Sequence, residues 1–358
     1  MIVAADTSGR RVSASDLGVF VANAARFVAM REEDIVRFVD GLVEAELRGV
    51  STHGIVRVPP YIRSMAAGVI NPRPVTKTLR ELGATTLLDG DNGLGIVVGQ
   101  LAMDRAINLA STMGVGVVAV RNSNHTGMLA VHVIRAAAQD MVGYFTSNGP
   151  AIMPPFGGRE ARLGNSPFAY AIPTQSGEPV VLDLACSTVA RGAIRLLADR
   201  GEPIPEGWAL DDEGHPTRDA EAAMAGVVVP MAGYKGYGIA FVNEVLSGAL
   251  PGARLAVDMP RAFLEKGSKM IDSWESGHLA VAFNVSCFGE LSDFKNEVGR
   301  LVQAMKETPL APGAEPVLVP GERESIARAE SLSEGVPVSG RVIKELDSFA
   351  DEIGIDRV

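Results

Sequence analysis

Apolar residues recur at helical spacing near both ends of the chain. Over residues 15–50 they form two runs, and the second run follows the acidic start Glu32-Glu33-Asp34, which is typical of a helix N-terminus. The runs are Leu17, Phe20, Val21, Ala24 and Phe27, and then Ile35, Phe38, Val39, Leu42 and Val43. After Phe288 the helical pattern returns and predicts helices over Asn296–Met305, Ser325–Ser333 and Val342–Ile353.

After the sequence Asn71-Pro72-Arg73-Pro74, the hydrophobic pattern changes. From about residue 78 to residue 300, short strand-like apolar runs alternate with helical stretches. The predicted strands there are Thr85–Leu88, Val115–Val120, Val142–Phe145, Phe168–Ile172, Val180–Leu184 and Leu279–Phe283. Helical stretches such as Val97–Ala110 and Met128–Ala138 lie between some of them. This alternation predicts an α/β domain over residues 78–299. We expect the helical parts, residues 1–77 and 300–358, to pack together as one discontinuous domain beside it.

Composition narrows the class of protein. The 358 residues include 33 Lys and Arg against 43 Asp and Glu, a net charge of −10. This balance disfavours nucleic-acid binding, because basic patches carry affinity for phosphate backbones. Hydrophobic residues make up 47% and charged residues 21%, as in soluble globular proteins. We find no apolar run of about 18 residues and no signal-peptide pattern, so we expect a cytoplasmic enzyme without a membrane partner.

Cysteines and several histidines carry little chemistry in this sequence. Cys186 and Cys287 are too few for a disulfide framework and lack a Cys-x-x-Cys spacing, so we expect free buried thiols in a reducing compartment. His132, His215 and His278 fall into no metal-ligand spacing. We therefore expect no metal site and interpret these histidines as structural or surface residues.

The glycine-rich stretch Gly93–Gly99 imitates a dinucleotide-binding motif. It follows a predicted strand and opens a helix, but its spacing is G-x-G-x-x-x-G where a Rossmann fold needs G-x-G-x-x-G. The next strand ends at Arg121-Asn122 without the acidic residue that would bind the ribose. We interpret the stretch as a helix-entry turn and reject a standard Rossmann domain.

Two motifs place histidines in candidate sites. In Ser51-Thr52-His53-Gly54, Arg57 follows four residues after His53, so a helix would put both on one face, and Arg offers a planar fork for a carboxylate. A capped helix start with a surface Arg is an equally good interpretation. In Arg121–Gly127, a strand enters a polar loop that opens a helix, and His125 lies where it could exchange a proton. Turn and cap residues around a bystander His are the alternative.

Three further motifs are candidate ligand contacts. Asp183 ends a strand, where an acid can orient a ligand or a catalytic His, or simply cap a helix. Lys235 lies in the Gly-rich turn Gly233–Gly238 before an apolar helix, where it could face a phosphate. Pro320-Gly321-Glu322-Arg323 precedes another predicted helix and is either a turn or a phosphate contact.

Together these motifs resemble the type 2 malate/L-lactate dehydrogenases, a family that also includes ureidoglycolate and sulfolactate dehydrogenases and cyclic ketimine reductases. The resemblance follows nearly the whole chain in order. It includes ELRGVSTHGIVRVPPYI at 46–62, VRNSNHTG at 120–127, NGPAIMPPFGG at 148–158, GNSPFAYAIPT at 164–174, VLDLACSTVARG at 181–192, EPIPEGWALDDEGHPT at 202–217, GYKGYG at 233–238 and VPGERE at 319–324.

The resemblance implies an NAD- or NADP-dependent oxidoreductase that interconverts a small 2-hydroxy acid and its 2-keto acid. It implies a non-Rossmann α/β cofactor domain with a mixed sheet, and a homodimer. By motif, His125 resembles the general acid/base, with His53 and Thr52 beside it. Arg57, His53 and Asn165 resemble substrate contacts. The implied cofactor contacts are His125, Thr126, Gly127, Met128, Leu129, Asp183, Leu184, Ala185, Lys235, Gly236, Leu318, Pro320, Gly321, Glu322 and Arg323.

The sequence departs from the family pattern in three places. Thr52 stands where the family usually has Ser, and it keeps the hydroxyl but adds a methyl group. Ala193 follows Ala190-Arg191-Gly192 where ketimine reductases have an acid of a Ser-His-Asp relay, which disfavours imino-acid reduction. The segment between about residues 217 and 227 looks shorter than usual, on the side of the cofactor.

Other functions remain open on the residues alone. An imino-acid reductase or a ureidoglycolate-type dehydrogenase would belong to the same family. Thr52, His53 and Asp183 could form a hydrolytic triad, although the chain has no G-x-S-x-G elbow. A member that binds the nucleotide without catalysis is a further alternative.

Overall fold

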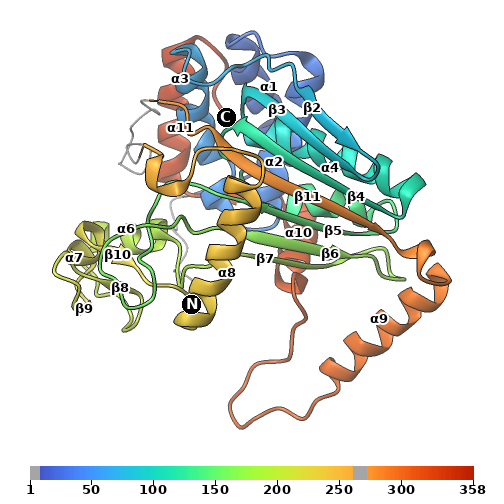
Figure 1. Cartoon of the computed structure of the whole chain (residues 1–358). Helices are drawn as coiled ribbons and strands as arrows, with labels where there is room; N and C mark the ends of the chain where they lie inside the picture. Colours follow the sequence, from blue (N-terminus) through green and yellow to red (C-terminus); the bar gives the residue numbers. More distant parts are fainter. Residues whose placement is uncertain (1–8, 261–271) are drawn as a thin grey trace.

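A mixed seven-stranded sheet forms the centre of the computed structural model, which describes residues 9–260 and 272–358 (Figure 1). The strands lie in the order β2-β3-β4-β11-β5-β6-β7, and only β3 and β4 pair in parallel. In this order their bounds are Lys77–Leu82, Thr85–Gly93, Val115–Ser123, Ser276–Asn284, Met141–Ser147, Phe168–Ile172 and Val180–Leu184. All six predicted strands are present. β2 was missed because every residue of this edge strand is exposed and none shows a buried face.

Two helices pack closely on this sheet. They are α4 (Gly95–Met113) and α5 (Ala130–Ala137), and both lie over the predicted positions with slightly different ends. Small residues allow the close approach. A Cβ on Gly116 would lie 1.9 Å from the Ala106 carbonyl oxygen, and one on Gly143 would lie 2.7 Å from that of Val133. The stretch Gly93–Gly99 is therefore the entry into α4, as the sequence predicted.

The two chain ends share one hydrophobic core. α1 (Ala14–Phe27), α2 (Glu32–Leu47), α3 (Val58–Ala66) and α11 (Gly340–Ile353) contribute to it. Its large side chains include Leu17, Phe38, Tyr61, Leu346 and Phe349. β1 (Arg10–Val12) pairs antiparallel with β12 (Val336–Val338). The predicted division at residues 77 and 299 remains a prediction, and the shared core supports the expected discontinuous helical part.

A small lobe is inserted directly after β7. It contains α6 (Arg191–Arg200), α7 (Ala220–Ala225) and a short sheet of β10 (Val227–Val228), β8 (Ala209–Leu210) and β9 (Pro216–Thr217). A bridge between Ser187 and Pro230 closes the insertion. Its two-residue strands are too short to give a pattern and were missed. The helix that Asp183–Ser187 was expected to begin is α6, and it begins only at Arg191.

The remaining helices follow the lobe. α8 (Tyr234–Glu244) continues into a π-helical segment over Val245–Ala249. α9 (Leu291–Lys306) has no buried residue and extends away from the body, and a loop returns from it to α10 (Glu322–Glu334) (Figure 1). Short 3-10 turns span Ser51–His53, Ile55–Arg57, Ala256–Asp258 and Val285–Cys287.

Two general expectations can be compared with this fold. Both cysteines are free thiols, but only Cys186 is buried; Cys287 is exposed because it lies in a surface turn, so the expectation of two buried thiols was wrong for it. Of the helices over residues 9–260 and 272–358, none combines the length and the apolar character that crossing a bilayer requires.

Candidate active site

The His125 loop, residues 124–129, connects the C-terminal end of the inner strand β4 to α5. The Asn124 side chain fixes it, because its amide nitrogen donates to the Asn92 side-chain oxygen at 2.9 Å and its own oxygen accepts from the Trp274 backbone N–H at 3.1 Å. Farther along, the His132 ring nitrogen Nε2 lies 3.2 Å from the Thr126 carbonyl oxygen. The loop is therefore held from both sides, with the His125 ring at its start.

Some of the non-glycine residues with positive φ angles lie beside the same loop. Asn92, Asn122 and Glu275 all adopt positive φ angles of 56°, 54° and 50°, which are unusual for residues other than glycine. Each lies within two residues of a hydrogen-bonding partner of the loop or of the loop itself. Strained backbone of this kind is concentrated at functional sites.

The His53 turn, residues 51–57, is not the single helix that would place His53 and Arg57 on one face. Two 3-10 turns meet at Gly54 instead. Arg57 folds back, and its Nε donates to the Thr52 carbonyl oxygen at 2.7 Å. The Thr52 hydroxyl lies 2.9 Å from His53 Nδ1. The predicted neighbours are thus brought together by side-chain contacts rather than by helical spacing.

The two histidine motifs meet in space. The rings of His53 and His125 stack with their centroids 5.6 Å apart and an angle of 16° between their planes. Tyr61, fully buried in α3, places its hydroxyl 2.5 Å from His125 Nδ1, and the Gly127 N–H also reaches this nitrogen at 3.2 Å. Trp274 stands edge-on to the His125 ring, with centroids 5.6 Å apart.

Tyr61 and Trp274 were not among the predicted site residues. Tyr61 lies in the quoted stretch VRVPPYI, so its sequence position beside the His53 motif was a usable signal. Trp274 lies two residues before the start of β11, and no local motif marks it.

The environment of the histidines favours their neutral forms. Burial, and then the positive charge of Arg57, lower the pKa of His53 to about 4. The same two causes, followed by the neighbouring His53, lower the pKa of His125 well below its ordinary value. Burial raises the pKa of Tyr61, so its hydroxyl keeps its proton. Both rings are therefore neutral at pH 7, whereas the sequence alone suggested titration close to neutrality.

Asp183, at the end of β7, stabilises the far end of the His125 loop. Its carboxylate accepts from the Ala130 N–H at 2.8 Å and also from the Leu129 N–H, so it caps the N-terminus of α5. Burial raises its pKa to about 6 against the effect of these hydrogen bonds. A triad with Thr52 and His53 would need Asp183 to orient His53 Nδ1, but that nitrogen is bound by the Thr52 hydroxyl. The hydrolytic alternative is therefore not supported by this geometry.

The segment before α10 lies against β7. The Pro320 carbonyl oxygen accepts from the Val181 N–H at 3.1 Å. Gly321 has a φ of +80°, and a Cβ there would lie 2.7 Å from the Val181 carbonyl oxygen, so this approach requires glycine. Glu322 accepts from Lys306 and from the Val319 N–H, and Arg323 pairs with Glu324 at 2.9 Å.

Lys235 lies inside α8 rather than in a turn before it, because the helix begins at Tyr234. The start of this helix is tied to β7 through Met231, whose N–H donates to the Cys186 carbonyl oxygen at 2.9 Å. The Gly236 N–H in turn donates to the Met231 carbonyl oxygen at 3.1 Å, and a Cβ on Gly236 would lie 2.1 Å from that oxygen. Lys235 is exposed in the first turn of the helix.

The other predicted contacts lie along these same segments. The carbonyl oxygen of Asn165 accepts from the Cys186 N–H at 2.8 Å, which places Asn165 beside the end of β7. Leu184 and Ala185 continue β7, Met128 is buried in the His125 loop, and Leu318 is exposed before α10. Ala193 lies in α6, and the predicted short segment 217–227 forms β9 and α7.

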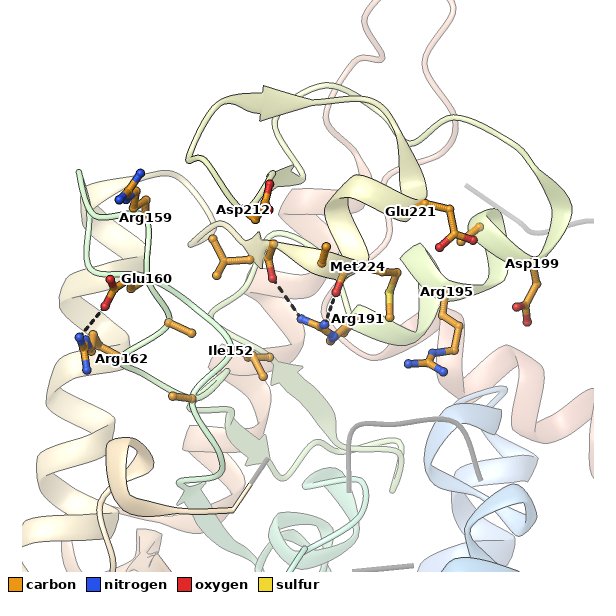
Figure 2. A pocket seen from close by; sticks show the side chains of 16 residues that line it. Ile152, Arg159, Glu160, Arg162, Arg191, Arg195, Asp199, Asp212, Glu221 and Met224 are labelled. Atoms are coloured by element: carbon orange, nitrogen blue, oxygen red, sulfur yellow. Dashed lines mark hydrogen bonds and ion pairs between the residues drawn. The ribbon is translucent and has the colours of Figure 1, made fainter. Parts of the chain in front are cut away.

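A separate cleft lies in the small lobe. It has a volume of about 760 Å³ and is lined by residues of the lobe and of the stretch 151–162. Figure 2 shows Arg191 donating to the Met224 and Gly226 carbonyl oxygens, and Arg162 paired with Glu160. Its lining contains none of the predicted catalytic, substrate or cofactor residues.

The segments along β7 and its continuation fit a dinucleotide. The N-termini of α8 and α10 are tied to this strand or its continuation, and helix N-termini favour phosphate groups, whereas the N-terminus of α5 is already capped by the Asp183 carboxylate. Lys235 adds a positive charge at the start of α8. The His125 loop leads from this region to the stacked histidines, so a nicotinamide cofactor held here would supply a hydride carrier beside a proton-exchanging ring.

Comparison with known proteins shows the family and the fold. The family model described as malate/L-lactate dehydrogenase matches residues 12–347. A malate dehydrogenase of Pyrococcus abyssi is 34% identical over 96% of this chain and 95% of its own, and an L-sulfolactate dehydrogenase of Methanocaldococcus jannaschii is 37% identical over 91% and 92%. The malate dehydrogenase structure of Pyrococcus horikoshii OT3 superposes with a TM-score of 0.90 at 30% identity, covering 100% of this chain and 99% of that one.

The fold and the site define an NAD(P)-dependent oxidoreductase that acts on the CH–OH group of a 2-hydroxy acid through a non-Rossmann cofactor domain. Its mixed sheet and helical cover match those of solved dehydrogenases. The chain belongs to the malate/L-lactate dehydrogenase family.

Proposed function

We propose that this enzyme is a malate/lactate-type dehydrogenase in which the His53 turn binds the substrate carboxylate and His125 exchanges the hydroxyl proton. The observation that carries this assignment is the stack of His53 on His125, with ring centroids 5.6 Å apart. The stack lies at the start of the His125 loop, and Asp183 fixes the far end of that loop. Arg57 supplies the permanent charge on the same turn. The relatives named malate and L-sulfolactate dehydrogenase act on 2-hydroxy acids, which supports this substrate class.

The proposed proton path uses His125 Nε2. Nδ1 already contacts the Tyr61 hydroxyl at 2.5 Å, so we assign Nε2 to the substrate oxygen. For oxidation the neutral ring carries its proton on Nδ1, which donates to the Tyr61 hydroxyl oxygen, so that Nε2 is the accepting nitrogen. The hydroxyl proton of the 2-hydroxy acid passes to Nε2 as the hydride passes from C2 to the nicotinamide ring of the bound cofactor. Tyr61 is thus proposed as the residue that orients His125.

The proposed cofactor contacts are those gathered at the end of β7. NAD or NADP, when bound, supplies the hydride acceptor at the nicotinamide ring. Lys235 and the N-termini of α8 and α10 would hold its phosphates, while the His125 loop and Asp183 to Ala185 would border the rest.

The imino-acid alternative has less support. In the ketimine-reductase pattern an acid follows Ala-Arg-Gly, and Ala193 has no group that could take its place. The His53 Nδ1 atom is hydrogen-bonded to the Thr52 hydroxyl, where the relay would need a carboxylate further along.

We also propose a homodimer that works in the cytoplasm. α8 and α9 expose large apolar side chains that a second copy could cover; these include Phe241, Val242, Leu301 and Met305. The free thiol of exposed Cys287 suits a reducing compartment. Light scattering after size-exclusion chromatography measures the assembly directly.

The experiment for the catalytic proposal is a panel of 2-keto acids, each assayed with NADH and with NADPH, beside a cyclic ketimine. We expect turnover of an open-chain keto acid that bears a carboxylate and no comparable turnover of the ketimine. The reverse ranking would replace this function by imino-acid reduction. Cofactor binding without any turnover would identify a non-catalytic member.

A further inference from the structure

Glu46 is a buried carboxylate directly beneath the His53 turn. It lies near the end of α2, is only 3% exposed, and accepts from the Ile55 N–H at 2.9 Å through Oε1. The Ser51 side chain also hydrogen-bonds to it. Its two contacts therefore fall in the first and the second 3-10 turn, on either side of Gly54.

The turn is shaped around this carboxylate. A Cβ placed on Gly54 would lie 2.1 Å from Glu46 Oε1 and 2.5 Å from its carboxyl carbon, so no side chain fits at Gly54 while Glu46 keeps its place. The backbone on both sides of Gly54 closes through hydrogen bonds from His53 to Val50 and from Arg57 to Gly54, each at 2.9 Å. His53 and Arg57 thus flank the point where the turn rests on Glu46.

The helix that carries Glu46, α2, is held rigidly. α2 is part of the helical core, and its surface near Glu46 is fixed by Glu44, which accepts from Arg48 at 2.7 Å and from Arg328 of α10 at 2.8 Å. Glu46 therefore connects an irregular surface turn to a packed helix. Burying a carboxylate destabilises the fold unless its contacts compensate, and burial raises the pKa of Glu46 to about 7. An apolar residue would fill the same place without this cost, so packing alone does not account for Glu46.

We propose that Glu46 is a positioning residue that fixes the His53 turn and thereby holds Arg57 and His53 in the geometry that binds the substrate carboxylate. It acts through Ile55 and Ser51 and does not itself contact the substrate. This inference rests on the proposed role of the His53 turn. It assigns to Glu46 an effect on the keto acid that is separate from any effect on the cofactor, because the cofactor segments are fixed at the end of β7 by other hydrogen bonds.

The test compares Glu46→Leu with Glu46→Gln. Leu removes the acceptor for the Ile55 N–H, whereas Gln keeps an oxygen that can accept it. We expect Glu46→Leu to raise the keto-acid KM by about tenfold or more, with the cofactor KM changed less than about twofold, and Glu46→Gln to recover most of the loss. The matched control is Glu33→Gln, an exposed acid in the first turn of the same helix, which should leave both KM values close to those of the wild-type enzyme.

Two further measurements show whether the Glu46 variants fold and test the same contact from Gly54. Thermal melting should show Glu46→Leu and Glu46→Gln at least as stable as the wild-type enzyme at pH 8, where the native carboxylate is charged. If Glu46→Leu does not fold, Gly54→Ala tests the same contact from the other side and should raise the keto-acid KM alone. An unchanged keto-acid KM in a folded Glu46→Leu, or equal rises for keto acid and cofactor, would overturn the proposal.

Arg57→Lys, measured in parallel, distinguishes the role proposed for Glu46 from the role proposed for the His53 turn. If Arg57→Lys raises the keto-acid KM and Glu46→Leu does not, the Glu46 proposal fails while the His53 turn keeps its role. If neither variant changes the keto-acid KM, the assignment of the substrate carboxylate to the His53 turn is wrong.

Discussion

The substrate side and the cofactor side of this site are held by different kinds of interaction. On the substrate side, ring stacking and side-chain hydrogen bonds join the His53 turn, Tyr61 and the His125 loop. On the cofactor side, backbone hydrogen bonds and glycines tie the N-termini of α8 and α10 to β7 or its continuation, and the Asp183 carboxylate caps α5. Side-chain contacts depend on single functional groups, whereas backbone contacts persist through most substitutions. We therefore expect the largest single-residue effects on the substrate side.

The largest effect is expected for His125→Gln. Glutamine keeps a polar side chain but cannot exchange the proton, so kcat should fall by roughly 10²–10⁴ while the cofactor still raises the melting temperature. Steady-state kinetics with a thermal-shift control measure both quantities. If His125→Gln stays active and His53→Gln is inactive, the two rings exchange the roles that we propose.

Arg57→Lys should have the next largest effect. Lysine keeps the charge but loses the planar fork that pairs with a carboxylate, so kcat/KM for the keto acid should fall by about 10- to 100-fold. The cofactor KM should stay nearly constant, which would separate the two sides of the site. Kinetics indistinguishable from the wild-type enzyme would assign the carboxylate to another group.

Lys235→Ala tests the cofactor side and should be milder, because helix N-termini continue to face the phosphates. We expect the cofactor KM to rise by about tenfold and the keto-acid KM to change far less. A larger effect on the keto acid than on NADH and NADPH would move Lys235 to the substrate side and remove the contrast between the two regions.

The smallest expected effect is that of pH, near neutrality, on kcat/KM for the hydroxy acid. Oxidation requires a neutral His125, and because the pKa of His125 lies well below its ordinary value and that of His53 lies at about 4, the ring is already neutral at pH 7. The kcat/KM for the hydroxy acid should therefore be insensitive to these rings between about pH 7 and 8 and fall only as acid protonates them. A midpoint near the ordinary histidine pKa that disappears in His125→Gln would show that the ring is less desolvated than its surroundings indicate.

Local patterns predicted most regular elements of the fold. The strands with buried faces and the long amphipathic helices had clear periodicity, and the glycine spacing correctly excluded a Rossmann fold. The exposed edge strand β2 and the short strands of the small lobe were missed, because neither burial nor length gave them a pattern. In the site, the motifs around His53 and His125 were recognisable one by one, although nothing in either motif indicated that their rings stack.

By itself, the sequence determined the class of enzyme, the α/β core and the residue types available for chemistry, because motifs and periodicity are local properties of the chain. Only the tertiary structure decided which groups meet. It placed Tyr61 and Trp274 on His125, set Glu46 beneath Gly54, and turned Asp183 towards the N-terminus of α5. It also lowered the pKa of both histidines, because desolvation depends on everything that packs around a ring and not on its sequence neighbours.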